Sequence, residues 1–200
     1  MGIVRGVAID KVEPLIECVI SAGLKTMEIT MNTPEAVSII KKAVEVSSGR
    51  VDVGAGTVLS VRDMRTALDA GASFIVMPVY IKDIVGLCVK EGTPVFPGAL
   101  TPQEVFTAWE AGPSMVKVFP ASVLGPRYLK ELKGPFDKMK LMAVGGVRPD
   151  NVEEYFSNGA DAAAFGGSVF SKELLANDDF DTIRENVSLL VEEVKKHHKR

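Results

Sequence analysis

Short apolar runs alternate with longer amphipathic stretches along the whole chain of 200 residues. The short runs are rich in Val and Ile or are apolar on both faces, which is typical of buried strands in a parallel sheet. Between them, apolar residues recur three and four positions apart, as on the buried face of a helix. This pattern predicts eight strands, each followed by a helix, with the strands at residues 3–7, 26–31, 51–58, 74–79, 94–98, 115–120, 140–145 and 162–166.

Residues that start and stop helices occur between these strands. Thr101-Pro102-Gln103-Glu104 combines an N-cap, a proline in the first turn and a glutamate positioned for a capping box. Thr33-Pro34-Glu35 predicts another helix start, with Thr33 as the N-cap. Several helices are predicted to end at glycines, which are Gly23, Gly71, Gly92, Gly112 and Gly159.

Eight strand–helix units without a linker or a shift in composition predict a single domain, residues 1–200, with the α/β fold of a (β/α)8 TIM barrel. A doubly wound open sheet is the alternative, but it usually carries Gly-x-Gly-x-x-Gly after its first strand, and residues 6–10 read Gly-Val-Ala-Ile-Asp. Because the first strand begins almost at residue 1, we expect any helix that closes the bottom of the barrel to be missing or to belong to a longer chain.

Composition and charge narrow the class of function. The chain is 46% hydrophobic and 24% charged with a net charge of −3, so it can form one core and has no field that favours nucleic acid or a membrane surface. No apolar run approaches the roughly 20 residues of a membrane span, and the N-terminus lacks a signal-peptide pattern. We therefore expect a cytoplasmic protein in which Cys18 and Cys88, both in apolar helical stretches, are buried free thiols.

Histidine is confined to His197 and His198, close to the C-terminus. Zinc and iron sites usually take imidazoles from the body of the fold, and Ser-His-Asp or Cys-His catalysis also requires one. We therefore expect neither a metal nor a cofactor.

Lys117 is unusual because its neighbours in the predicted strand are the apolar residues Met115, Val116, Val118 and Phe119. A buried ammonium is costly, so a lysine there is either paired or deprotonated, and burial lowers its pKa from about 10.4 toward neutrality. The neutral amine is a nucleophile for carbonyl carbon, as in Schiff-base enzymes. The alternative is a lysine whose head reaches solvent past the end of the strand.

Other polar residues fall at the C-terminal ends of the predicted strands, where barrels carry their chemistry. Glu28 is placed to face Lys117 across the barrel mouth, either as a general acid and base or as a structural ion-pair partner. Arg5 and Thr57 are candidates to bind a carboxylate or phosphate group.

Glycine pairs follow the last two predicted strands, as Gly145-Gly146 and as Gly166-Gly167 with Ser168. Loops at these two places often bind phosphate through backbone N–H groups, and the Ser168 hydroxyl adds a donor. Such glycines also occur simply because a turn is tight. The two pairs together predict a phosphorylated ligand.

With these residues in order, the chain resembles the 2-keto-3-deoxy-6-phosphogluconate aldolase family, which includes phosphogalactonate and 4-hydroxy-2-oxoglutarate aldolases. The similarity covers almost the whole chain. The matching segments are residues 3–6, 28–30, 54–58, 96–98, 101–104, 116–121, 125–126, 144–147 and 166–168.

This resemblance implies a metal-free class I aldolase, usually a homotrimer, that releases pyruvate and glyceraldehyde 3-phosphate from a phosphorylated keto acid. It implies that Lys117 forms the Schiff base and that Glu28 is the general acid and base. The remaining roles implied are acid-substrate binding by Arg5 and Thr57, walls of the pyruvate pocket from Phe119 and Pro78, and phosphate binding by Gly145, Gly146, Gly166, Gly167 and Ser168.

Three positions depart from the phosphogluconate pattern. Asn32 stands where that branch has an arginine for the pyruvate carboxylate, and Val144 stands where it has a threonine. Both departures resemble the phosphogalactonate branch. Met77-Pro78-Val79 matches neither branch. We expect Asn32, Met77 and Val144 to decide which sugar acid the amine attacks.

Two other classes of function compete with the Schiff-base aldolase. One is another phosphate-binding barrel enzyme, such as an epimerase or a thiazole- or thiamine-pathway enzyme, in which Lys117 only contacts an anion. The other is a barrel that binds a sugar phosphate without turning it over.

Overall fold

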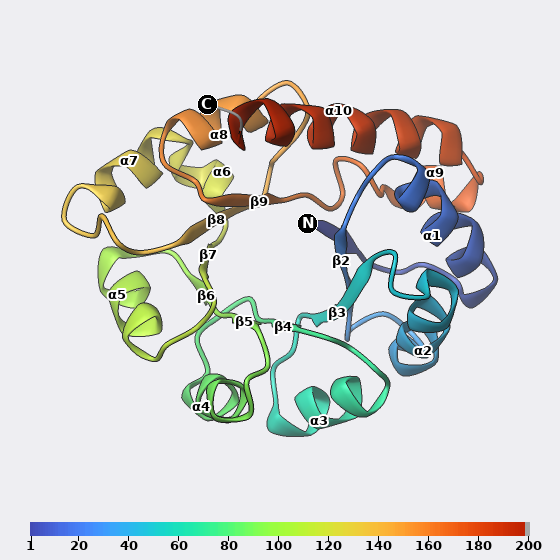
Figure 1. Cartoon of the computed structure of the whole chain (residues 1–200), viewed down its shortest axis with the longest axis horizontal. Helices are drawn as coiled ribbons and strands as arrows, with labels where there is room; N and C mark the ends of the chain where they lie inside the picture. Colours follow the sequence, from blue (N-terminus) through green and yellow to red (C-terminus); the bar gives the residue numbers. More distant parts are fainter. Residues whose placement is uncertain (199–200) are drawn as a thin grey trace.

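The computed structural model describes residues 1–198, in which parallel strands form the wall of a barrel and helices surround it (Figure 1). The strands are β1 (Gly2–Val4), β2 (Thr26–Thr30), β3 (Asp52–Gly56), β4 (Ile75–Val76), β5 (Val95–Phe96), β6 (Gly98–Ala99), β7 (Val116–Val118), β8 (Leu141–Val144) and β9 (Ala162–Ala164). The short 3-10 helix η1 (Ile9–Lys11) precedes α1. The helices are α1 (Val12–Ser21), α2 (Ala36–Ser47), α3 (Val61–Asp69), α4 (Lys82–Glu91), α5 (Pro102–Glu110), α6 (Ala121–Leu124), α7 (Arg127–Lys133), α8 (Val152–Ser157), α9 (Lys172–Ala176) and α10 (Phe180–His198).

The wall of the barrel closes at two places, between β5 and β6 and between β9 and β1. Pro97 divides the fifth predicted strand into β5 and β6, and its carbonyl accepts a hydrogen bond from the Lys117 backbone N–H at 2.9 Å. On the other side, the Ile3 N–H donates to the Phe165 carbonyl at 2.7 Å, which joins β9 to β1. The predicted (β/α)8 barrel is confirmed.

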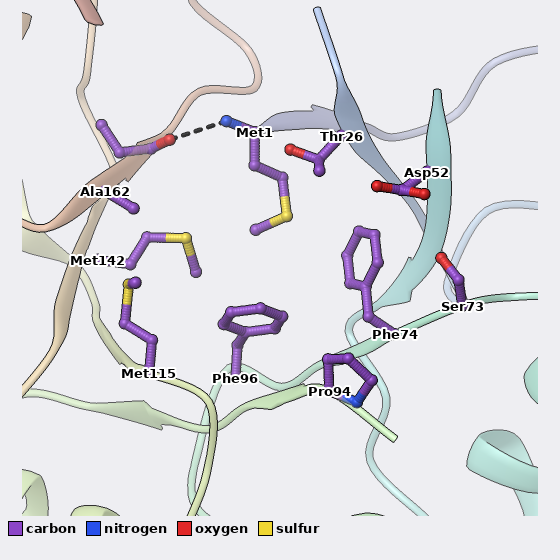
Figure 2. A pocket seen from close by; sticks show the side chains of 11 residues that line it. Met1, Thr26, Asp52, Ser73, Phe74, Pro94, Phe96, Met115, Met142 and Ala162 are labelled. Carbon is purple, nitrogen blue, oxygen red and sulfur yellow. Dashed lines mark hydrogen bonds between the residues drawn. The ribbon is translucent and has the colours of Figure 1, made fainter. Parts of the chain in front are cut away.

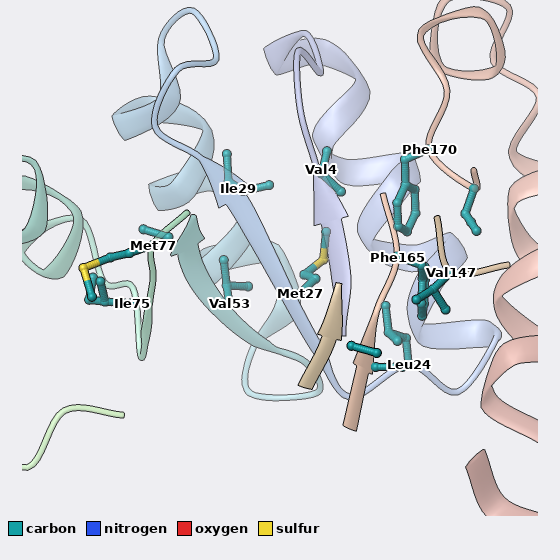
Figure 3. Packing of buried hydrophobic residues seen from close by; sticks show 14 of the residues in the cluster. Val4, Leu24, Met27, Ile29, Val53, Ile75, Met77, Val147, Phe165 and Phe170 are labelled. Atoms are coloured by element: carbon teal, nitrogen blue, oxygen red, sulfur yellow. The ribbon is translucent and has the colours of Figure 1, made fainter. Parts of the chain in front are cut away.

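The larger apolar core lies between the strands and the surrounding helices. Alternate strand residues point outward into it, including Val4, Met27, Ile29, Val53 and Ile75 (Figure 3). The buried faces of the helices complete this cluster, which is why their apolar residues recur at helical spacing. Cys18 and Cys88 are buried free thiols in it, as predicted.

A smaller apolar cluster fills the inside of the barrel. Its buried members are Met142, Val144 and Ala164. Towards the N-terminal ends of the strands, Met1, Phe74, Phe96, Met115 and Met142 line an apolar cavity of about 420 Å³ (Figure 2). Thr26, Asp52 and Ser73 also line this cavity.

The two predicted helix starts have different outcomes. At α5, Thr101 accepts from the Glu104 N–H and the Glu104 side chain accepts from the Thr101 N–H, which confirms the capping box. At α2 the prediction of Thr33 as the N-cap is wrong, because Glu35 takes that position. The Thr33 hydroxyl instead accepts from the Gly6 N–H at 3.0 Å, which ties the loop after β1 to the loop after β2.

None of the helices within residues 1–198 is both long enough and apolar enough to span a membrane.

Candidate active site

A cavity of about 530 Å³ opens at the C-terminal ends of the strands. Every residue for which the sequence analysis names a catalytic, substrate-binding or phosphate-binding role lines it. These residues are Arg5, Glu28, Thr57, Pro78, Lys117, Phe119, Val144, Gly145, Gly146, Gly166, Gly167 and Ser168. The fold thus brings together residues from β1 to the loop that follows β9.

Strand alternation turns the two central side chains into the barrel. Val116 and Val118, on either side of Lys117, belong to the outer core between strands and helices. Successive side chains of a strand point to opposite faces, so Lys117 points inward. The same argument applies to Glu28, whose neighbours Met27 and Ile29 also pack in the outer core.

A glycine on the adjacent strand β3 leaves room for Glu28. In the parallel pairing of the strands, Lys117 is opposite Gly98 and Glu28 is opposite Gly54. Further along β3, a Cβ atom on Gly56 would lie 2.1 Å from Oε1 of Glu28, closer than any real contact. The position of the Glu28 carboxyl group therefore depends on glycine at position 56.

Glu28 is fully buried, and both of its carboxyl oxygens lack a hydrogen-bond partner within residues 1–198. Burial raises the pKa of Glu28 to about 7, although the positive charges of Lys117, the amino terminus and Arg5 act in the opposite direction. A carboxyl group with this pKa exists in both protonation states near neutrality, as a general acid and base requires.

Lys117 is 6% exposed. Burial lowers the pKa of its ammonium below the ordinary value, Glu28 raises it and Arg5 lowers it. Its Nζ atom lies 5.2 Å from the ring centroid of Phe119, which also lines the cavity. The head of Lys117 thus stays inside the barrel mouth, where a lowered pKa increases the fraction of nucleophilic amine.

Thr57, directly after β3, adopts a left-handed backbone conformation with φ 53°. A β-branched residue rarely adopts this conformation, and such strain persists only where the surrounding structure enforces it. Backbone hydrogen bonds on both sides of Thr57 hold it, from Met31 N–H to the Gly56 carbonyl and from Val58 N–H to the Val76 carbonyl.

The glycine loops border the far side of the cavity. Gly145 and Gly146 have φ angles of 102° and 74°, which other residues rarely adopt. The Ser168 hydroxyl donates to the Val147 carbonyl at 2.7 Å, so its proton bridges the two loops instead of pointing freely into the cavity. The serine oxygen remains an acceptor in this arrangement.

Two of the three positions expected to control substrate choice do not line the cavity. Met77 is fully buried in the outer core and lies outside the cavity lining. Asn32 is exposed and lies outside the cavity lining. Val144 does line the cavity.

Sequence reasoning missed Ile3, Phe170, Ser171 and Lys172, which also line the cavity. Lys172 lies four residues beyond Ser168, where the chain has already left the strand and no apolar run draws attention to a charge. Its position shortly after β9 was the one available signal, since the segments that follow barrel strands carry the chemistry.

Residues 1–198 contain no group of three or more His, Cys, Asp or Glu side chains that is able to hold a metal ion. The ring of His197 packs in a tilted arrangement against Phe156 of α8, with ring centroids 5.0 Å apart. The side chain of His198 lies outside the described part.

Comparison with known proteins shows which family the chain belongs to. A family model described as KDPG and KHG aldolase matches residues 1–186. The chain belongs to the KDPG and KHG aldolase family. The family match thus includes every residue of the cavity, from Ile3 to Lys172.

The chain is also similar in sequence and in structure to individual members of this aldolase family. The 2-dehydro-3-deoxy-6-phosphogalactonate aldolase of Escherichia coli K12 is 34% identical over 85% of this chain and 83% of its own length. The 2-dehydro-3-deoxy-phosphogluconate aldolase of Treponema pallidum is 33% identical over 88% of this chain and 86% of its own length. A solved structure described as native KDPGal has a TM-score of 0.91 and 30% identity, covering 100% of this chain and 95% of that one.

Proposed function

We propose that this member of the family is a class I aldolase that cleaves 2-keto-3-deoxy-6-phosphogalactonate, 2-keto-3-deoxy-6-phosphogluconate or both to pyruvate and glyceraldehyde 3-phosphate. The observation that carries the proposal is the pair of Lys117 and Glu28 inside the barrel mouth. Burial moves both of their pKa values toward neutrality. An amine and a carboxyl group tuned in this way suit Schiff-base formation followed by proton transfer.

The first half of the proposed reaction forms the Schiff base. The neutral Lys117 amine adds to the C2 keto carbon and gives a carbinolamine. Protonated Glu28 donates its proton to the C2 hydroxyl, which leaves as water, and the nitrogen lone pair forms the iminium. Because both Glu28 oxygens are unpartnered among residues 1–198, a bound hydroxyl or water is their natural partner.

The second half breaks the carbon–carbon bond. The Glu28 carboxylate takes the proton of the C4 hydroxyl, the C3–C4 bond breaks, and its electron pair passes to the iminium to give an enamine. Glyceraldehyde 3-phosphate leaves at this step. Protonation of C3 and addition of water to the resulting iminium then release pyruvate and restore the amine.

Other residues of the cavity hold the substrate in this proposal. Arg5 and Thr57 bind the C1 carboxylate, since the charge of Arg5 acts on both Glu28 and Lys117 and so lies near the reacting carbon. Phe119 and Pro78 form the apolar walls around the pyruvate part. The loops of Gly145 and Gly166 approach the phosphate with their backbone N–H groups.

The aldolase is further proposed to be a cytoplasmic homotrimer. The exposed apolar side chains of Val79, Val123 and Leu124 support an association between copies.

Reduction with borohydride in the presence of pyruvate tests the Schiff base. We expect mass spectrometry to find a reduced pyruvate adduct on the peptide that contains Lys117. Lys117→Arg keeps the positive charge but lacks a nucleophilic amine, so it should lose both the adduct and aldolase activity while keeping its circular dichroism spectrum. A wild-type protein that forms no adduct would point instead to a barrel that only binds sugar phosphates.

Steady-state kinetics on the two epimeric sugar acids test substrate choice. Val144 has no hydrogen-bonding group to distinguish the orientation of the C4 hydroxyl, and one neutral hydrogen bond is worth only about 1 kcal/mol. We expect kcat/KM values for the two epimers to agree within about tenfold. 4-Hydroxy-2-oxoglutarate serves as the third substrate, and a strong preference for it would replace the phosphorylated substrates with the alternative of the family.

A further inference from the structure

Two exposed cationic residues line the cavity, Arg5 and Lys172. Lys172 has no role in the proposed reaction so far. It is the first residue of α9, and it lines the same cavity as Lys117. Among residues 1–198 it takes part in no ion pair, whereas lysines such as Lys11 and Lys133 are paired with carboxylates. Its ammonium is therefore available to a ligand.

The backbone that carries Lys172 is anchored at the cavity. The Ser171 hydroxyl accepts a hydrogen bond from the Leu174 N–H at 3.1 Å and caps the short helix. Phe170, next to it, is buried against Phe165, with ring centroids 6.0 Å apart. These contacts hold the Lys172 backbone at the cavity edge and leave only its flexible side chain to adapt to a ligand.

The charges of the cavity match a substrate with an anion at each end. Its ionisable residues are Arg5, Glu28, Lys117 and Lys172. In the proposed reaction Lys117 reacts as a neutral amine and Glu28 exchanges a proton, so Arg5 and Lys172 are the two lasting cations. A phosphorylated keto acid carries a carboxylate at one end and a phosphate of nearly two negative charges at the other.

Arg5 lies close to the reacting pair. Ile3, two residues before Arg5, pairs with Glu28, and the charge of Arg5 contributes to the pKa of both Glu28 and Lys117. Lys172 reaches the cavity from the start of α9, just after the loop of Gly166 and Gly167, where the backbone leaves open space at Gly167.

We propose that Lys172 binds the phosphate of the substrate and makes the enzyme select phosphorylated over unphosphorylated sugar acids. The proposal rests on the proposed aldolase function and extends it to a residue outside the glycine loops. Arg5 then holds the carboxylate end and Lys172 the phosphate end, which places the C2 carbon at Lys117.

The test compares Lys172→Ala with Lys172→Arg and with a matched control, Lys82→Ala. Lys82 is likewise the exposed first residue of a helix, α4, but it does not line the cavity. KM and kcat are measured for 2-keto-3-deoxy-6-phosphogluconate and for unphosphorylated 2-keto-3-deoxygluconate. Binding of glycerol 3-phosphate is measured by calorimetry as a readout that needs no turnover.

We expect Lys172→Ala to raise KM for the phosphorylated acid about tenfold, the scale of one lost charge-assisted hydrogen bond, with kcat nearly unchanged. Glycerol 3-phosphate should bind about tenfold more weakly, while kinetics on the unphosphorylated acid stay the same. Lys172→Arg should retain most of the affinity, and Lys82→Ala should match the wild type.

Unchanged affinity of Lys172→Ala for glycerol 3-phosphate overturns the proposal, and so does an equal loss on both sugar acids, which indicates a structural role. If the proposed aldolase function is itself wrong, the wild-type protein gives neither a Lys117 adduct nor turnover. In that case the calorimetric comparison still decides whether Lys172 binds phosphate.

Discussion

At the scale of single residues, burial controls the chemistry of Glu28 and Lys117. Both side chains lie inside the barrel wall, where the charged form of each is poorly solvated. Their mutual attraction works against this effect but does not cancel it, since the pKa of Glu28 remains raised and that of Lys117 lowered. Glu28 therefore exists in both protonation states near neutrality, and its burial has a cost in stability.

Replacement of Glu28 by glutamine makes this cost measurable. The pKa of Glu28 is 4.5 in an ordinary setting and about 7 in the folded protein, so the folded state holds its proton more tightly than the unfolded state. Stability from this group is full below pH 4.5 and is lost as the pH rises through about 7. The loss amounts to about 3 kcal/mol.

Glutamine does not titrate, so the Glu28→Gln variant lacks this loss of stability with rising pH. We therefore expect its free energy of unfolding, relative to the wild type, to increase by about 3 kcal/mol between about pH 4 and about pH 8. Urea unfolding at a series of pH values measures this difference. If the free energies of unfolding of the two proteins change with pH in parallel, Glu28 is not held in its neutral form.

At the scale of secondary-structure elements, β3 shapes the site without contributing a charge. Its glycines at positions 54 and 56 leave space for the Phe74 ring and the Glu28 carboxyl group, which an added Cβ atom would meet at 2.3 Å and 2.1 Å. Glycine weakens a strand, so its presence at these positions has a steric reason. Pro97 plays a similar part between β5 and β6, where its carbonyl binds the Lys117 backbone.

Gly56→Ala tests the contact between β3 and Glu28. The new methyl group displaces the carboxyl group from its place, and a shift of about 1 Å in a catalytic group lowers kcat about 100-fold. We expect this loss in steady-state kinetics, while the borohydride adduct on Lys117 still forms. The control is Gly86→Ala in α4, where an added Cβ meets no atom within 4 Å.

Gly86→Ala should leave kcat unchanged and stabilise the protein by about 0.5–1 kcal/mol. A Gly56→Ala variant with wild-type kcat would mean that the strand yields and the carboxyl group keeps its position.

At the scale of the whole molecule, the barrel collects loops from distant parts of the sequence around one cavity. Arg5 and Lys172 are separated by most of the chain and still line the same cavity, because β9 pairs with β1. The net charge of the protein is −3, so a cavity with two lasting cations attracts anions locally and not through the overall field.

The sequence by itself determined the barrel and pointed to most of the residues that line its cavity. Strand alternation and strand-end position are local properties, so they identified Lys117, Glu28 and the glycine loops before any contact was known. The capping box at Thr101 followed in the same way, from residues that touch their neighbours in the chain.

Tertiary structure alone decided which other side chains reach the site. Met77 precedes Pro78 in the chain, yet it points outward into the core while Pro78 lines the cavity. Thr33 bonds to Gly6 instead of capping α2, and Lys172 reaches the cavity from the first turn of α9. These outcomes depend on how strands pair and loops meet across the closed barrel, and such contacts between residues far apart in sequence leave no local pattern to read.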